Sequence, residues 1–482
     1  MQLNRRQFIG TSALAAAPFV LTGCASPLAK AYAVNGIIKI GVIGLGRIAI
    51  TMDIPGVMGF KDLCRVVAVC DLDKERLANG KRFVEEGYAK KGIVQEVKTY
   101  TDYIDMIDNA EVDAVMVCVP DHWHALCASA ALAAGKHVWL QKPFAQTIRE
   151  GRLIANLAKR NNCVMQVGSW QRSCKNFHDI CELARNGRVG NIVRVEVGIG
   201  CDSPGGSSAA EPVPATFDYE KWLGPTPAGV PYNWTRCHTR DLKRIGDRPG
   251  WIQLAPYGWG MITNWGAHHI DIVHWGLGYD FAGPDAVSGT CEWMDLSNGR
   301  LWNVHTKYDL HYTYGKTDVH VCNKYPMGVK FIGEKGEWLY CERGGATVTP
   351  SDPKGDGKMG PFMASNVKLL EPLAEADRKV ALKVSNNHFK NWLEGIRKGD
   401  PDYTITCAEG AHRSTASCSL GHMVMELGRG KKDGASIKWD TNKETTGNAE
   451  ADKLMNPFAR DKYDLKVVLK HYGLNFNEVM KG

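Results

Sequence analysis

Two short polar clusters follow apolar runs of the kind that form buried strands. Pro120-Asp121-His122-Trp123-His124 comes after the run 114–119, and Gln141-Lys142-Pro143 comes after the run 137–140. Lysine and histidine side chains can hold or transfer a proton when their surroundings tune their pKa. The carboxyl ends of parallel strands meet at one edge of a sheet, where ligands bind. We therefore expect both clusters in one crevice.

A third polar cluster lies in Asn264 to Gly278, which reads NWGAHHIDIVHWGLG. If residues 264–276 form a helix, residues three or four apart share a face. One face then carries Asn264, His268, Asp271 and Trp275, and the other carries Gly266, Ile270, Val273 and Leu277. A polar stripe on a helix usually faces solvent, so this pattern alone does not define a site. His269 and His274 are interpreted as structural.

A glycine-rich turn points to a dinucleotide. The run at 38–43, IKIGVI, is short and rich in β-branched residues, which is typical of a buried strand. It leads directly into Gly44-Leu45-Gly46-Arg47-Ile48-Ala49, a G-x-G-x-x-A pattern. The first glycine permits a tight turn, the second lets the backbone approach a pyrophosphate, and the small third residue lets helix and strand pack closely. The pyrophosphate would sit on the helix N-terminus, where free N–H groups favour an anion.

An acidic residue follows the second predicted strand, Arg65 to Cys70. Asp71 stands where a carboxylate accepts hydrogen bonds from the ribose hydroxyls of NAD and repels the 2′-phosphate of NADP. The pattern therefore favours NAD as the cofactor. The residues predicted to contact it are Gly44, Gly46, Arg47, Ile48, Asp71, Pro120, Asp121, His124, Gln141 and Lys142.

The order of the predicted elements indicates an α/β fold. Up to residue 168, strands alternate with helices at 101–109, 121–134 and 148–160, which is typical of a doubly wound parallel sheet, the Rossmann fold. Later runs at 192–197, 301–309, 329–332 and 337–340 predict a C-terminal α+β domain with a large open, mostly antiparallel sheet. The predicted units are an NAD-binding domain at 36–168, a substrate and oligomerisation domain at 169–385, and a helical segment at 386–482 that packs back toward the first domain.

The bulk composition is that of an ordinary globular enzyme. Hydrophobic residues make up 44% and charged residues 23% of the 482 residues. The net charge of +7 is dispersed without a long basic run, so nucleic-acid binding is not predicted. The 15 cysteines form no CxxC pair and no metal-type spacing, which argues against a disulfide scaffold and against a metal site. His122 and His124 are interpreted as cofactor packing rather than metal ligands.

Residues 4–24, NRRQFIGTSALAAAPFVLTGC, have the pattern of an export signal. Arg5-Arg6 before an apolar stretch resembles a twin-arginine signal, and Leu21 to Cys24 resembles a lipobox whose cysteine would be lipidated. Cleavage after Ala31-Tyr32-Ala33 is the alternative. We therefore exclude residues 1–33 from the fold and expect a periplasmic or lipid-anchored protein. The twin-arginine resemblance implies export in the folded state, with NAD tightly bound inside.

Taken together, the motifs resemble those of the Gfo/Idh/MocA family of oxidoreductases. The matching pieces are the glycine-rich turn, Val119-Pro120 with His124, Gly135 to Val138, Gln141-Lys142-Pro143, Gln166 to Gly168, Asp218 to Pro227, Asn264 to Gly278, Asn387-His388 and Glu409 to Ser414. They extend over nearly all of the chain after residue 36.

The resemblance implies catalytic roles for residues in two of these motifs. In that family, the lysine of a Glu-Lys-Pro motif lies beside the nicotinamide, and a histidine is the general base; these are Lys142 and His268 here. Gln141 stands where glutamate is usual, which removes a negative charge near Lys142. Asn264, the third predicted catalytic residue, stands where aspartate is usual, so His268 is expected to lack a carboxylate partner and to titrate lower. Weaker candidates for substrate contact are Arg172, Asp271 and Trp275.

The implied activity is NAD-dependent oxidation or reduction of a hydroxyl on a sugar, polyol or glycoside. Six of the 14 tryptophans lie between Trp222 and Trp275 and would suit sugar rings, and loops at 201–214 and 224–231 are expected over the crevice. One alternative is a redox-neutral NAD-dependent glycoside hydrolase or lyase that forms a transient 3-keto sugar. Its lysine motif typically differs, which favours a dehydrogenase. Another is a non-catalytic sugar-binding protein with structural NAD. The resemblance also implies a homodimer or homotetramer.

Overall fold

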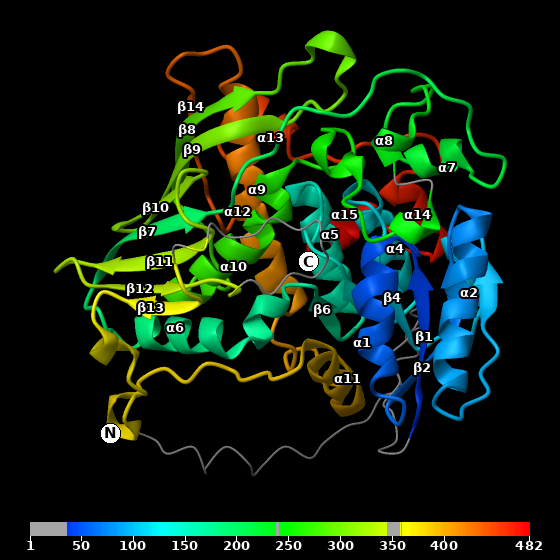
Figure 1. Ribbon diagram of the computed structural model, residues 1–482, viewed down its shortest axis with the longest axis horizontal. Coiled ribbons are helices and arrows are strands. Elements are labelled where there is room, and N and C mark those ends of the chain that lie inside the picture. The colour runs from blue at the N-terminus through cyan, green and yellow to red at the C-terminus, as the bar shows by residue number, and fades with distance from the viewer. Residues whose placement is uncertain (1–35, 238–240, 345–356, 358) are drawn as a thin grey trace, which may run out of the picture.

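The computed structural model describes residues 36–237, 241–344, 357 and 359–482, and in it two β-sheets stand side by side with helices between and around them (Figure 1). The predicted export signal and Cys24 lie outside the described residues. None of the helices in the described part of the chain is long and apolar enough to cross a membrane.

The first sheet has six strands in the order β3-β2-β1-β4-β5-β6, and every neighbouring pair is parallel. Its order reverses between β1 and β4, which creates the crevice where dinucleotides bind in such sheets. The elements are β1 (Ile38–Ile43), a π-helix (Ala49–Asp53), α1 (Ile54–Met58), β2 (Cys64–Cys70), α2 (Lys74–Ala89), β3 (Lys98–Tyr100), α3 (Tyr103–Asn109), β4 (Ala114–Val117), α4 (Asp121–Ala133), β5 (His137–Leu140), α5 (Ile148–Arg160) and β6 (Met165–Val167).

Local sequence explains the two helices that follow β4 and β5. Every residue of the alanine-rich α4 is buried, because α4 packs against β5, α3, α5 and α14. Helix α5 instead has an apolar face and a capping box, in which Thr147 and Glu150 each bond the backbone N–H of the other. The two helices therefore fix the strand ends that carry the polar clusters.

The second sheet has eight strands in the order β13-β12-β11-β7-β10-β9-β8-β14. All neighbouring pairs are antiparallel except β7 and β10. The strands are β7 (Ile192–Gly198), β8 (Ala286–Trp293), β9 (His305–Tyr314), β10 (Thr317–Cys322), β11 (Gly328–Gly333), β12 (Trp338–Cys341), β13 (Phe362–Ala364) and β14 (Ala435–Lys438). The helices are α6 (Lys175–Arg185), α7 (Tyr219–Leu223), α8 (Trp234–Cys237), α9 (Met261–Asn264), α10 (Gly266–Leu277), α11 (His388–Lys398), α12 (Ala408–Leu427), α13 (Ala449–Lys453), α14 (Leu465–His471) and α15 (Phe476–Met480).

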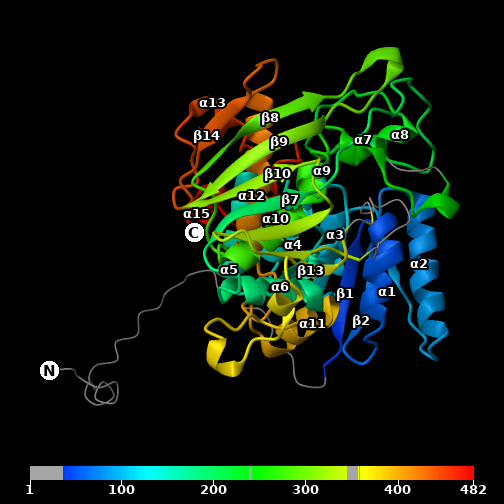
Figure 2. The same cartoon turned by 60° about the vertical axis from the view of Figure 1, so that its left-hand side comes forward.

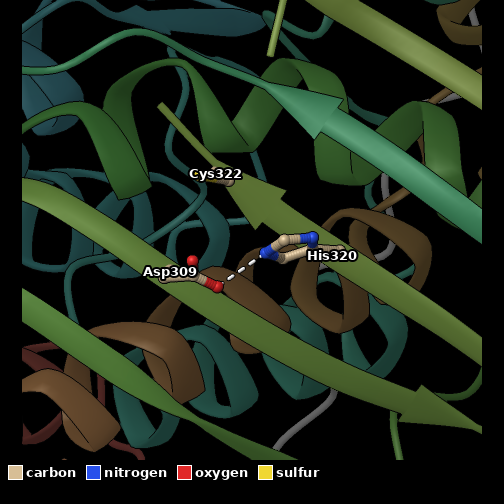
Figure 3. A group of neighbouring side chains, drawn as sticks. All are labelled: Asp309, His320 and Cys322. Carbon is tan, nitrogen blue, oxygen red and sulfur yellow. Dashed lines mark hydrogen bonds and ion pairs between the residues drawn. The ribbon is translucent and has the colours of Figure 1, made fainter. Parts of the chain in front are cut away.

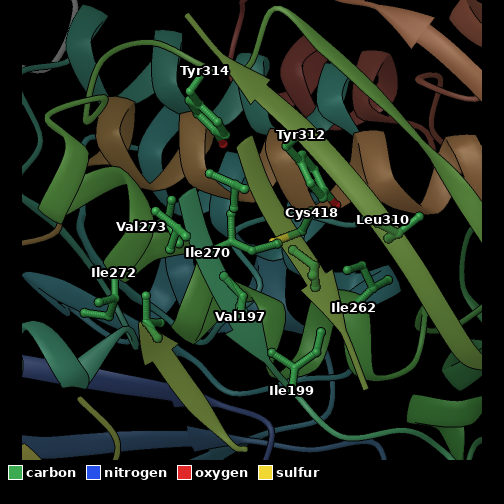
Figure 4. Packing of buried hydrophobic residues seen from close by; sticks show 14 of the residues in the cluster. Val197, Ile199, Ile262, Ile270, Ile272, Val273, Leu310, Tyr312, Tyr314 and Cys418 are labelled. Atoms are coloured by element: carbon green, nitrogen blue, oxygen red, sulfur yellow. The ribbon is translucent and has the colours of Figure 1, made fainter. Parts of the chain in front are cut away.

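Helices α10 and α12 cover one face of this sheet (Figure 2). Ile270 and Val273 of α10 lie in the same buried cluster as Leu310 and Tyr312 of β9 and Cys418 of α12 (Figure 4). Burial of each large apolar side chain stabilises the fold by roughly 1.5–3 kcal/mol. Helix α12 also packs against α5, so it joins the second sheet to the first domain.

The predicted fold class is confirmed, with corrections in three segments. The segment 264–276 is not one helix with a polar surface, because the chain breaks at Trp265 and α10 is buried on all sides. The strand expected at 301–309 is β9 and runs from His305 to Tyr314. The predicted helical segment 386–482 also contains strand β14, which pairs with β8. Each of the 14 described cysteines is free.

Candidate functional site

A large cavity opens at the carboxyl ends of the first sheet, with about 1320 Å³ of empty space. All ten predicted cofactor-binding residues line it, although their contact with a cofactor stays a prediction. Gly44 has φ +87°, and a Cβ there would lie 2.7 Å from the Cys118 carbonyl oxygen, so the turn requires glycine. A Cβ at Gly46 would meet no atom within 4 Å. Gly46 therefore faces open space, where a pyrophosphate can approach the backbone.

Asp71 lies at one end of this cavity and also holds the glycine-rich turn. Its Oδ2 accepts a hydrogen bond from the Leu45 N–H at 2.7 Å, and its Oδ1 accepts one from the Asp73 N–H at 2.9 Å. Burial raises the pKa of Asp71, and nearby Arg76 opposes that rise. A ribose hydroxyl would meet a carboxylate that is already oriented by backbone donors.

His124 connects the two strand ends that carry the polar clusters. Its Nδ1 lies 2.7 Å from the Pro143 carbonyl oxygen, and its Nε2 lies 3.0 Å from that of Val119. Burial lowers the pKa of His124 to about 4, so the ring is neutral near pH 7 and donates a hydrogen bond to only one of these two carbonyl oxygens. The neighbouring His122 bonds the Trp222 carbonyl and does not line the cavity. Both histidines therefore have packing and hydrogen-bonding partners.

A segment of the second domain covers the same cavity, but it is not the predicted pair of loops, because no residue of 201–214 or 224–231 lines the cavity. Its contributions to the wall are Phe217, Lys221, Trp222, Cys237, Ile245, Asp247, Pro249, Trp251 and Ile252. These residues come from α7, α8 and the irregular chain around them. This side of the cavity is therefore formed largely by surface loops, the part of a fold in which binding residues are most often found.

A second cavity of about 580 Å³ adjoins the first. The two share Arg47, Ile48, Gln141, Lys142 and Asn264 in their walls. Lys142 Nζ donates to the backbone oxygen of Asn264 at 3.0 Å, so the contact uses the main chain of Asn264 and not its amide. The predicted base, His268, lines the second cavity only. Lys142 therefore lies in the wall that the two cavities share.

His268 is 4% exposed, and among the described residues no partner bonds its Nδ1. Burial lowers the pKa of His268 well below 6.5, and the positive charges of Arg343 and Lys142 lower it further. None of the charged neighbours that shift this pKa is a carboxylate. The imidazole is neutral near pH 7 and has a free lone pair.

Eight lining residues of the second cavity are not among the predicted site residues. They are Met52, Asp53, Trp139, Gly168, Trp170, Trp265, Arg343 and Phe389. The Arg343 guanidinium lies over the rings of Trp170 and Trp265, at 4.6 Å and 4.1 Å from their centroids. Two sequence signals pointed to this group: Trp265 is one of the six tryptophans between Trp222 and Trp275, and Asp53 is a lone acid within the apolar run 48–58.

The structure does not bring the weaker substrate candidates into either cavity. Arg172 is buried and binds both oxygens of Asp271, at 2.7 and 2.8 Å, and also pairs with Asp280 at 2.8 Å. Its guanidinium lies 5.3 Å from the ring centroid of Trp275. Because Arg172, Asp271 and Trp275 satisfy one another, we assign them to packing beside the site rather than to substrate contact.

One group of potential metal ligands occurs in the described residues, on the second sheet (Figure 3). Ligand atoms of Asp309, His320 and Cys322 lie within 4.8 Å of one another. His320 Nε2 lies 2.6 Å from Asp309 Oδ1, and its Nδ1 lies 2.9 Å from Arg194 Nη2. Arginine only donates, so Nδ1 is the acceptor and Nε2 carries the hydrogen. This tautomer donates to Asp309 and leaves no lone pair for a metal.

Comparison with known proteins gives one family match. Residues 38–169 match the model of an oxidoreductase family with an NAD-binding Rossmann fold. A glycosyl hydrolase family 109 protein of Shewanella sp. (strain ANA-3) is 28% identical over 208 residues, 40% of this chain and 42% of that protein. Inositol 2-dehydrogenase 1 of Saccharopolyspora erythraea is 32% identical over 162 residues, 33% of this chain and 44% of that protein. The matched region is thus less than half the length of either relative.

The whole fold resembles solved structures at low identity. The WlbA dehydrogenase from Bordetella pertussis, solved with NADH and UDP-GlcNAcA, superposes with a TM-score of 0.55 at 15% identity. The match covers 84% of this chain and 99% of that one. At this identity the likeness concerns the fold alone.

Proposed function

Because residues 38–169 match the model of the NAD-binding Gfo/Idh/MocA oxidoreductase family, we propose that this protein is an NAD-dependent oxidoreductase for a hydroxyl group of a sugar, polyol or glycoside. The observation that carries the proposal is the position of Lys142, in the wall shared by the two cavities. A cofactor in the first cavity and a substrate in the second would meet at this lysine. Bound NAD would supply the hydride acceptor or donor.

The residues of the first cavity fit NAD. Gly44 and Gly46 give the close backbone approach that a pyrophosphate needs, and Asp71 provides an oriented carboxylate for ribose hydroxyls. The negative charge of Asp71 disfavours a 2′-phosphate. His124 fixes the relative position of the two strand ends and so the position of Lys142.

His268 and Lys142 are the groups proposed to handle the substrate proton. The low pKa of His268 keeps its imidazole neutral, so its ring can accept the hydroxyl proton during oxidation and return it during reduction. Lys142 Nζ is a charged donor that can hold the substrate oxygen. The positive charge of Lys142 lowers the pKa of His268, so it favours return of the proton from His268 to the substrate oxygen.

The aromatic lining of the second cavity supports a sugar-like substrate. Trp170 and Trp265 line it together with the hydrogen-bonding side chains of His268 and Lys142. A sugar ring has apolar C–H faces, which pack on aromatic rings, and polar hydroxyl edges, which form hydrogen bonds. We extend the proposal to a pyranose, polyol ring or glycoside as the substrate class.

The experiment is near-ultraviolet absorbance of the purified protein, which reports reduced nicotinamide, with a panel of sugars, polyols and glycosides. We expect bound NAD that becomes reduced by one substrate class. Lys142→Met and His268→Gln should each lower the rate by about 100-fold or more while NAD remains bound. The control is Asp295→Asn, since Asp295 is an exposed acid that lines neither cavity. Unchanged rates in both site variants would refute the assigned roles.

One comparison favours a second candidate, the redox-neutral hydrolase. One protein of similar sequence is named a glycosyl hydrolase family 109 protein. In that reaction the hydroxyl carbon would be oxidised to a ketone, the aglycone eliminated, water added in its place, and the ketone reduced again by the same hydride, so that no net oxidation occurs. Release of aglycone from a chromogenic glycoside with no lasting absorbance change would identify it. Bound NAD with neither outcome would instead indicate a sugar-binding protein with structural cofactor.

A further inference from the structure

A buried carboxylate lies in the wall of the second cavity, and the reaction proposed above gives it no role. Asp53 is the last residue of the π-helix Ala49–Asp53, and it is only 1% exposed. A π-helical turn inserts one residue into a helix and is frequent at functional sites. A buried carboxylate is costly unless hydrogen bonds hold it, so the contacts of Asp53 are informative.

Asp53 holds the amide of Gln141. Gln141 Nε2 donates to both oxygens of Asp53, at 2.9 and 2.8 Å, and Cys118 Sγ donates to Oδ2 at 3.1 Å. A Cβ at Gly168 would lie 2.8 Å from Gln141 Oε1 and 3.2 Å from its Nε2, so only glycine leaves room for the amide. The hydrogen bonds to Asp53 hold the amide nitrogen.

Gln141 is in turn the residue before Lys142, and both lie in the wall shared by the two cavities. The side chain of Asp53 thus controls a group directly beside the proposed meeting point of cofactor and substrate. Among the described residues that line the second cavity, Asp53 is the one acid, and the other ionisable side chains are Arg47, Lys142, His268 and Arg343.

We propose that Asp53 is a positioning residue, whose ionised carboxylate fixes the orientation of the Gln141 amide and, through it, the strand end that carries Lys142. Ionised Asp53 only accepts hydrogen bonds, so it selects the orientation with Nε2 toward it. Protonated Asp53 has an O–H donor and can also bond the amide oxygen, so the selection is lost. This role rests on the function proposed above.

Its consequence is a pH dependence in the slightly acidic range. Burial raises the pKa of Asp53 to about 6, and the hydrogen bonds from Gln141 and Cys118 oppose the rise. Other groups that face Asp53 titrate elsewhere, because burial raises the pKa of Cys118 well above its usual value and the pKa of His268 lies well below 6.5. We expect kcat to rise through pH about 6 as Asp53 ionises.

The test exchanges the acid and the amide. Asp53→Asn should lower kcat by about 10-fold and abolish the rise of kcat near pH 6, with NAD affinity little changed. Gln141→Glu alone puts two carboxylates in contact and should lower kcat as well. The double variant Asp53→Asn/Gln141→Glu restores one carboxylate–amide pair with its partners reversed, and should recover most of the lost kcat. A wild-type profile that is flat near pH 6, or a double variant no better than the singles, would overturn the proposal.

A second measurement needs neither NAD nor substrate. The pKa of Asp53 is higher in the folded chain than its ordinary 3.8, so the folded state binds a proton more tightly than the unfolded state between pH about 4 and about 6. The free energy of unfolding of the wild type should therefore fall as the pH rises from about 4 to about 6, relative to that of Asp53→Asn. If this shift is found but the chain binds no NAD, the proposed function fails and the ionisation of Asp53 stands. If NAD-linked activity is found without the shift, the role of Asp53 fails alone.

Discussion

Asp71 combines two tasks at the end of β2, because it lines the first cavity, where we propose that NAD binds, and accepts a hydrogen bond from the Leu45 N–H of the glycine-rich turn. The two tasks can be separated by substitution. Asparagine keeps an acceptor oxygen for the Leu45 N–H but loses the negative charge, whereas alanine loses both. The comparison therefore distinguishes electrostatic selection of the cofactor from support of the turn.

We expect Asp71→Asn to narrow the preference for NAD over NADP, because the repulsion of the 2′-phosphate is removed. Asp71→Ala should in addition weaken NAD binding by about 10-fold or more, the effect of losing a hydrogen bond to a charged group. Tryptophan fluorescence titration with each nucleotide measures both dissociation constants. An unchanged ratio of the two constants in Asp71→Asn would show that Asp71 does not select the cofactor.

Sequence reasoning worked for residues whose position depends on local chemistry. Gly44, Asp71 and Lys142 each follow a strand of apolar residues, so the end of the strand locates them. The pairing of Arg172 with Asp271 joins residues far apart in the sequence, and no local pattern signals it. Asp53 was missed for a related reason, since a π-helical turn has no pattern that separates it from an α-helix.

At the scale of elements, an ion network ties α5 to α12 and to the chain after β14. Arg152 of α5 pairs with Glu409 at 2.7 Å and with Glu444 at 2.6 Å, and Glu444 also contacts His412 and Arg413. The network spans both domains, so its charges stabilise their contact. The hydrogen bonds and charges of these partners hold the pKa of Glu409 and of Glu444 at about 2, against the opposing effect of burial.

We predict that this network is lost in acid. Carboxyl groups whose pKa is lower in the folded state contribute stability above their unfolded value, 4.5, and lose it as the pH falls toward about 2. Glu444→Gln should lower the free energy of unfolding at pH 7 by roughly 2 kcal/mol and flatten this acid dependence. Denaturant unfolding at several pH values measures both effects, with the exposed Glu86→Gln as the matched control. Equal stability of Glu444→Gln and the control at pH 7 would contradict the prediction.

The elements themselves were predictable to different degrees. Strands of the first sheet are buried on both faces and read as continuous apolar runs, so β1 and β5 were located correctly. Strands of the second sheet alternate buried and exposed residues, and β9 was placed four residues early at its start. Helix α10 was predicted to be amphipathic, but its polar residues are buried as well. They can be buried because residues such as His274 bond other buried groups rather than water.

At the scale of the whole molecule, the fold brings together residues from both domains around one lysine. Lys142 comes from the first domain, whereas Asn264 and His268 come from the second. Loops of the second domain also line the first cavity. We propose that their contacts help to retain NAD bound there.

Tight binding matters because of the signal-like pattern in residues 4–24, from which we propose export of the folded, cofactor-loaded protein. Replacement of Arg5-Arg6 by two lysines should leave the protein in the cytoplasm, because twin-arginine recognition depends on the guanidinium pair and not on charge alone. Cell fractionation with activity measured in each compartment tests this. Cys24→Ala distinguishes the two predicted cleavage sites. It should release the protein from the membrane fraction if Cys24 is lipidated, and it should have no effect if cleavage follows Ala33. A wild-type protein found only in the cytoplasm would refute export, and NAD lost on simple dialysis would refute its retention.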